Sequence, residues 1–107
     1  MNTEAEKQAV LDLLRSTSGS GLTANQRLIL MVYSTLSTER SGVVRKTGAE
    51  LAKLLDLDPT VFSRLRRGLI KEGWLEESGP ALGNIRYYRL SEKSTGEQVV
   101  IPLRRAT

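Results

Sequence analysis

The chain of 107 residues is long enough for one globular domain with one hydrophobic core and too short for a second. It contains no cysteine and no histidine, which excludes disulfides, thiolate metal sites and histidine-dependent catalysis, and we expect neither a metal nor a cofactor. Lysine and arginine number 16 against 12 acids, and the resulting net charge of +4 favours a polyanionic partner.

The apolar runs of the sequence are short. The longest, at 28–33, falls far below the ~18 residues that a membrane span needs. The N-terminal residues also lack the basic-then-apolar order of a signal peptide. We therefore expect a cytoplasmic, nucleoid-associated protein with no membrane partner.

The first predicted element is an amphipathic helix over 4–16, with Val10, Leu13 and Leu14 on its apolar face. The Ser/Gly-rich stretch 16–21 that follows is typical of a flexible connector, which makes the first helix an appendage. Its apolar face then needs a partner, either a second copy of the chain or the chain's own domain.

A capping-box sequence, T-A-N-Q at 23–26, predicts the start of a second helix that fades over 37–42. Its expected apolar face consists of Leu28, Met31, Val32 and Leu36. Val43 and Val44 are β-branched and predict a very short strand.

Two further helices are separated by a tight turn. A second capping box, T-G-A-E at 47–50, opens a helix that ends near Asp56. Asp58 followed by Pro59 is typical of an N-cap and first helical position, so another helix should run on to Gly73. Its apolar face holds Phe62, Leu65 and Leu69. Two short helices joined in this way form a helix-turn-helix.

The segments 74–78 and 85–90 read as strands joined by a Gly/Pro/Asn-containing loop, which predicts a β-hairpin, or wing. The segment 98–103 contains a proline and suits an edge strand or a tail. The expected organisation is an N-terminal helix and linker over 1–21, a central unit over 22–91 and a C-terminal piece over 92–107.

From 22 to 90 the sequence resembles a bacterial winged helix-turn-helix DNA-binding domain. The stretch 50–64 is similar to an E-L-A-x-x-L helix, tight turn and T-V-S-R recognition helix, and 69–75 to the usual entry into the wing. MarR-like regulators and the winged helices of plasmid and phage replication proteins share this pattern, and 86–91 resembles the wing strand of PadR-like repressors. The resemblance implies a mainly α (α+β) fold, a three-helix core with a β-hairpin wing, and double-stranded DNA as partner.

The helix predicted from Pro59 to Gly73 carries a polar stripe opposite its apolar face, and this stripe holds cations and no acid. The stripe consists of Thr60, Arg64, Arg67 and Lys71. An arginine on such a face can donate two hydrogen bonds to guanine in the major groove. We expect Thr60, Val61 and Arg64 to read bases. We expect phosphate contacts from Ser63, Arg67 and Lys71.

Two flanking regions are expected to add contacts. Lys46, Thr47 and Gly48 stand at the start of the preceding helix, where free N–H groups favour a phosphate, although capping alone also explains Thr47. In the wing, Gly83, Asn84 and Arg86 are expected to reach an adjacent minor groove or backbone.

Helix-turn-helix proteins usually bind as symmetric dimers with recognition helices about 34 Å apart. On that basis Val10, Leu13 and Leu14 are assigned to a homodimer interface, with packing onto the chain's own domain as the alternative.

The sequence thus predicts a sequence-specific DNA-binding protein, most simply a transcriptional regulator, and no enzyme. Glu76 and Glu77 are adjacent on a strand and point to opposite faces, so they cannot act as an acid/base pair. The alternatives are a plasmid or phage replication or partition factor, a winged helix that contacts other proteins, and an RNA-binding winged helix.

Overall fold

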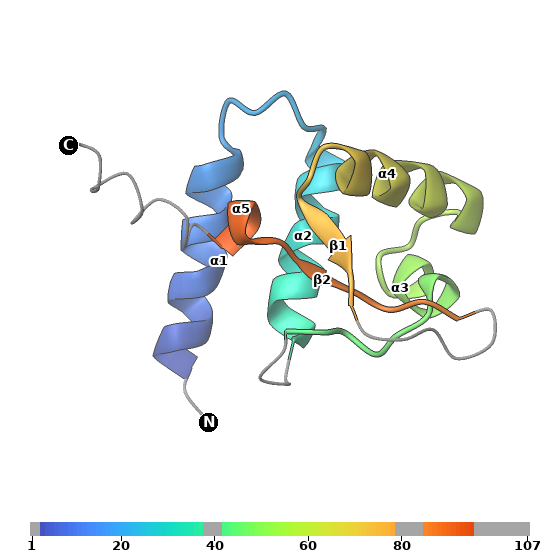
Figure 1. Ribbon diagram of the computed structural model, residues 1–107, viewed down its shortest axis with the longest axis horizontal. Helices are drawn as coiled ribbons and strands as arrows, with labels where there is room; N and C mark the ends of the chain where they lie inside the picture. Colours follow the sequence, from blue (N-terminus) through green and yellow to red (C-terminus); the bar gives the residue numbers. More distant parts are fainter. Residues whose placement is uncertain (1–2, 38–41, 79–84, 96–107) are drawn as a thin grey trace.

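Helices supply most of the structure and a short antiparallel hairpin supplies the strands. The computed structural model describes residues 3–37, 42–78 and 85–95. In chain order these ranges hold α1 (Thr3–Thr17), α2 (Ala24–Leu36), α3 (Gly48–Leu54), α4 (Pro59–Lys71), β1 (Leu75–Glu77), β2 (Tyr88–Leu90) and α5 (Glu92–Thr95) (Figure 1). None of the helices in these ranges combines the length and apolar character that crossing a bilayer requires.

The helices α2, α3 and α4 begin where the sequence predicts. Both capping boxes form: the side chains of Thr23 and Thr47 each accept a hydrogen bond from the backbone N–H three residues on, at 3.1 Å. The carboxylate of Asp58 accepts from the backbone N–H of Thr60 at 2.8 Å, with Pro59 as the first helical residue. Local hydrogen bonds of this kind determine the residue at which each helix begins.

The core lies between α2, α4 and the hairpin, and α1 and α3 also contribute to it. Its buried residues are Leu13, Ile29, Leu30, Tyr33, Val44, Leu51, Ala52, Phe62, Leu69, Trp74 and Leu75. The apolar face predicted for α2 is wrong at Leu28, whose side chain is 37% exposed. Because the residues at 28–33 are all apolar, their spacing does not reveal which of them turn inward.

Helix α1 is a docked part of the fold, which corrects the prediction of an appendage. It packs against α2 and α5, beside which it lies in Figure 1. The guanidinium of Arg27 on α2 donates hydrogen bonds to the Leu14 carbonyl and to the Thr17 hydroxyl, each at 2.9 Å. These bonds tie α2 to the last turn of α1, whose terminal carbonyls lack backbone N–H donors within the helix. The connector is a hydrogen-bonded turn, in which the Ser20 hydroxyl donates to the Thr17 carbonyl at 2.6 Å.

The hairpin pairs β1 with β2 in an antiparallel register that sets Leu75 opposite Leu90 and Glu77 opposite Tyr88. Both strands are shorter than the predicted 74–78 and 85–90. Val44 donates a backbone hydrogen bond to the Tyr88 carbonyl at 3.1 Å, so the predicted short strand is a single bridge on the open edge of β2. The predicted loop residues 79–84 and the segment 98–103 lie outside the described residues.

The short helix α5 has no counterpart among the predicted elements. The hydroxyl of Ser94 donates to the Trp74 carbonyl, and the backbone N–H of Ser91 donates to the same carbonyl at 3.0 Å. The ammonium of Lys93 lies 4.4 Å from the centre of the Trp74 ring. Four residues are too few to show a helical period, so only these contacts reveal the element.

Candidate nucleic-acid interface

A tight turn holds α3 and α4 in the arrangement of a helix-turn-helix. Asp56 occupies the left-handed region with φ 57°, a conformation that aspartate tolerates better than most residues. The backbone N–H of Leu57 donates to the Ala52 carbonyl at 2.9 Å and closes the turn. Asp58 then caps α4, so two short-range features direct the second helix away from the first.

The apolar side of α4 seats in the protein as the sequence predicts. Phe62 and Leu69 are 1% and 0% exposed, and Leu65 is half-buried against the same core. Gly73, with φ 85°, follows the end of the helix and allows Trp74 to donate back to the Leu69 carbonyl at 2.9 Å. The helix ends at Lys71, slightly earlier than predicted.

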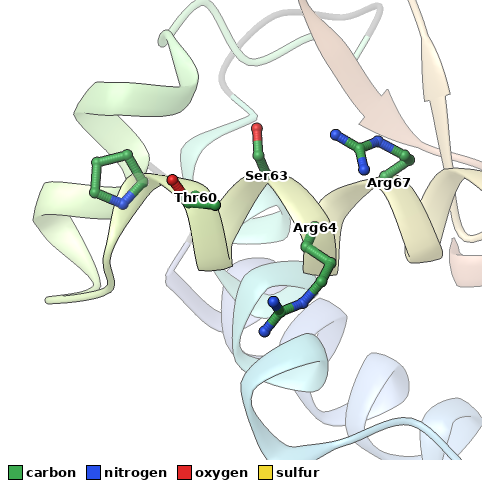
Figure 2. A pocket seen from close by; sticks show the side chains of 5 residues that line it. Thr60, Ser63, Arg64 and Arg67 are labelled. Atoms are coloured by element: carbon green, nitrogen blue, oxygen red, sulfur yellow. The ribbon is translucent and has the colours of Figure 1, made fainter.

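The opposite side of α4 faces solvent. The exposed residues there are Thr60, Arg64, Arg67 and Lys71, while Val61 and Ser63 are half-buried. In Figure 2, Ser63 and Arg67 point to one side of α4 and Arg64 points to the other. The two guanidinium groups therefore lie on either side of the helix. Within the described ranges, no salt bridge joins either arginine to an acid.

This face, which we call the α4 surface (Thr60, Ser63, Arg64, Arg67 and Lys71), combines cations with hydroxyl groups. Arginine offers paired N–H donors in a plane, which matches the acceptors of a phosphate or of a guanine edge. No acidic residue occurs between 60 and 71. The chemistry of the surface therefore suits an anionic, oxygen-rich partner.

The residues predicted to bind a phosphate ahead of α3 are only partly available. The N–H of Thr47 donates to the Glu50 carboxylate at 2.8 Å, and its hydroxyl accepts from the Glu50 N–H, so capping uses both groups. The hydrogen bond from the Thr47 backbone lowers the pKa of Glu50 and keeps a negative charge at this helix end. Gly48 is half-buried, and Lys46 is exposed. Thr47 thus acts as a cap, and Lys46 is an exposed cation close enough to Glu50 to help lower the pKa of that carboxyl.

Of the three residues predicted to contact DNA from the wing, the structure describes Arg86. Gly83 and Asn84 lie outside the described residues, whereas Arg86 precedes β2 and donates to the Glu77 carboxylate at 2.9 Å. The neighbouring Arg89 donates to Glu76 at 2.7 Å. Cross-strand ion pairs therefore offset these wing cations, and the two glutamates are separately engaged, as their placement on opposite faces requires.

The predicted dimer residues lie on α1. Leu13 is 2% exposed and belongs to the chain's own core, so the alternative of packing onto the same domain describes this residue. Val10 and Leu14 are half-buried. An interface on α1 would therefore have to use the outer part of the helix, where Leu11 is 45% exposed.

Sequence reasoning did not identify a role for Arg66. In the sequence it resembles the other cations of α4, and only its packing distinguishes it. Its guanidinium Cζ lies 5.2 Å from the Phe62 ring centre and 4.6 Å from the Tyr88 ring centre. Burial raises the pKa of Tyr33, and the neighbouring Arg66 side chain lowers it in part. The signal in the sequence was its position four residues after Phe62, on the flank of the buried face.

Comparisons with known proteins address the fold. No protein-family model matches this sequence, and no curated protein matches it significantly. The adhesin competence repressor AdcR of Streptococcus pyogenes is similar in structure, with a TM-score of 0.56 at 21% identity over 92% of this chain and 71% of its own. MarR of E. coli in its apo form is similar with a TM-score of 0.56 at 19% identity, over 94% and 79% of the two chains.

Both matches cover more than nine-tenths of this chain, so the likeness is not confined to α2, α3, α4 and the hairpin. At such identities the likeness concerns the fold and extends no further. It agrees with the three-helix core and hairpin that the sequence predicts. The chain has a winged helix-turn-helix fold, in which α1 is docked against α2 and α5.

Proposed function

We propose that this protein binds double-stranded DNA sequence-specifically and acts as a transcriptional regulator. In this proposal α4 enters the major groove and the wing contacts the flank. The observation that carries the proposal is the α4 surface: its three cations are exposed, it contains no acid, and no salt bridge in the described ranges pairs it with one. The similarity to a protein described as a repressor adds support for a regulatory role.

The roles combine position along α4 with the side of the helix. Thr60, Val61 and Arg64 lie in the first two turns of α4, the part of a recognition helix that usually meets base edges, and Ser63 points to the same side as Arg67 (Figure 2). Arg64 would donate to guanine, and the Thr60 methyl would contact thymine. Ser63, Arg67 and Lys71 would contact phosphates and fix the register.

The flank contacts are more restricted. Lys46 would add a phosphate contact beside α3, because its ammonium is exposed and Thr47 is occupied as a cap. Arg86 would reach DNA only after releasing Glu77. The α4 surface therefore supplies most of the electrostatic attraction in this proposal.

The test is selection of bound duplexes from a random pool, with wild type, Arg64→Ala and Arg15→Ala. Arg15 is an exposed arginine on α1, so its removal changes the net charge equally without touching the α4 surface. We expect the wild type and Arg15→Ala to enrich one motif. Arg64→Ala should lose the preference for guanine at one position per half-site. The expected loss in binding free energy on the guanine-containing site is about 1–3 kcal/mol.

The symmetry of the enriched motif tests whether the protein binds DNA as a homodimer. An inverted repeat would support binding as a homodimer, and a single half-site would count against it. Affinity for the selected duplex should fall steeply as salt rises, because cations on the protein release counterions from the DNA. If the wild type enriches no motif, sequence-specific DNA binding is wrong.

A further inference from the structure

Arg66 joins four elements at one point of the molecule. It leaves α4 and stacks its guanidinium on Phe62 of the same helix and on Tyr88 of β2, at 5.2 Å and 4.6 Å from the ring centres. Its positive charge also acts on the hydroxyl of Tyr33 on α2, where it offsets part of the rise that burial causes in the pKa. Its Nη1 and Nη2 lie 3.3 Å from the position that a β-carbon on Gly48 would occupy, at the start of α3.

The chemistry of this site requires arginine. A guanidinium is planar, so it can stack on two aromatic rings and still donate in its own plane, whereas an ammonium cannot do both. Within the described residues, no salt bridge pairs Arg66 with an acid. Aromatic faces and a hydroxyl therefore stabilise this half-buried charge.

The contact with Tyr88 connects β2 to α4, which also packs against the wing through β1. β2 packs chiefly on β1, α2 and α5. Tyr88 also accepts the backbone hydrogen bond from Val44, so β2 is held at this residue from two sides. A change at Arg66 would loosen the wing relative to the helix that carries Arg64 and Arg67.

We propose that Arg66 is a positioning residue for DNA binding, which locks the wing strand to α4 so that both meet a duplex in one fixed geometry. This inference rests on the proposed function. In it, Arg66 touches no DNA and acts through Tyr88. Removing it lowers affinity because the free protein must then order the wing on binding.

The experiment compares Arg66→Met with Arg67→Met, its exposed neighbour on the α4 surface, on a selected duplex across a salt series. A phosphate contact contributes about 0.9 to the slope of log K against log[salt]. We expect Arg66→Met to bind about tenfold more weakly with an unchanged slope. Arg67→Met should bind more weakly with a slope reduced by about 0.9.

Amide exchange in the free protein provides the second readout. The N–H groups of Val44 and Ser78 donate to the carbonyls of Tyr88 and Tyr87, at 3.1 Å and 2.9 Å. Arg66→Met should speed their exchange about tenfold while the α2 amides stay protected, which separates wing loosening from global unfolding. Arg67→Met should leave both amides unchanged.

A double-mutant comparison with Tyr88→Leu tests whether Arg66 acts through Tyr88. If Arg66 acts through Tyr88, adding Arg66→Met to Tyr88→Leu should weaken binding no further. Arg66→Lys should stay folded and still show faster amide exchange in the wing. If Arg66→Met does not fold, the same measurements are made on Arg66→Lys.

Two results would overturn the inference: a salt slope reduced by about 0.9 in the Arg66 variant, which indicates a direct phosphate contact, or unchanged wing exchange. If the wild type binds no duplex, the proposed function fails, and exchange at Val44 and Ser78 still reports whether Arg66 holds the wing.

Discussion

The side-chain amide nitrogen of Gln26 lies 3.1 Å from the position that a β-carbon on Gly68 would occupy. This close approach explains a glycine inside α4, where alanine would normally be more stable by about 1 kcal/mol. The same amide group completes the capping box of α2, since its oxygen accepts from the Thr23 N–H at 3.1 Å. An alanine at 68 must therefore displace a side chain that is already in use.

Gly68→Ala is expected to raise the free energy of unfolding by well under 1 kcal/mol, or to lower it. In a Gln26→Ala background, the same change should raise it by about 1 kcal/mol, because only the helix propensity then counts. Urea denaturation of the four proteins measures both values. Equal gains in the two backgrounds would show that Gln26 does not explain the glycine.

Glu77→Gln removes the carboxylate that pairs with Arg86. The ion pair is exposed, with side chains 42% and 58% accessible, so its loss should change stability by less than about 1 kcal/mol. The freed guanidinium can then contact a phosphate. We expect tighter duplex binding and a salt slope that is steeper by about 0.9, as measured by titration at several salt concentrations.

Asp12→Asn is the matched control for that change, because it removes one acid from an ion pair on α1, remote from α4. It should leave the salt slope unchanged. An equal effect of the two variants would mean that net charge alone governs affinity.

Tyr33 predicts a loss of stability at alkaline pH. Burial raises its pKa, and the neighbouring Arg66 side chain opposes this only in part. The unfolded chain ionises this tyrosine first, near pH 10, so its contribution is complete below about pH 10 and is lost as pH rises towards the folded pKa.

Above about pH 10, the wild type should therefore lose stability more steeply than Tyr33→Phe, by up to ~1.4 kcal/mol per pH unit until the folded pKa is reached. Thermal unfolding at a series of pH values measures the difference. Parallel curves for the two proteins would contradict the shift. The phenylalanine variant should be the less stable of the two at pH 7, because Arg66 loses an acceptor.

Local signals predicted the helix starts and the apolar side of α4. Thr23, Thr47 and Asp58 bond backbone groups within three residues, so their patterns fix the helix starts independently of the rest of the fold. The outward side of α4 followed from the same periodicity, because Phe62 and Leu69 determine which side turns inward.

Features that depend on distant residues could not be predicted in this way. Arg86 meets Glu77 only because of the strand register, and Ser94 meets Trp74 only after the hairpin returns. Arg66 looked like its neighbour Arg67, yet the ring of Tyr88 covers one and not the other. Sequence pattern gives the direction of a side chain on its own helix, and the partner it meets depends on the tertiary fold.

Asp56 lies in the turn between α3 and α4, in a backbone conformation that few residues adopt without strain. Its φ of 57° lies in the left-handed region, which costs most residues about 1–2 kcal/mol and glycine almost nothing. Asp56→Val should therefore lower the free energy of unfolding by at least about 1 kcal/mol. Asp56→Gly should stay within about 1 kcal/mol of the wild type, because relieved strain offsets the extra freedom of the unfolded chain.

The turn also orients α4 relative to α3, so a strained residue at 56 should affect recognition as well as stability. Under conditions where both variants are fully folded, Asp56→Val is expected to bind a selected duplex more weakly than Asp56→Gly, with the same salt slope, since no charged contact differs between them. Chemical denaturation and duplex titration of the pair measure the two effects. Equal stability of the valine and glycine variants would show that the turn does not need the left-handed conformation.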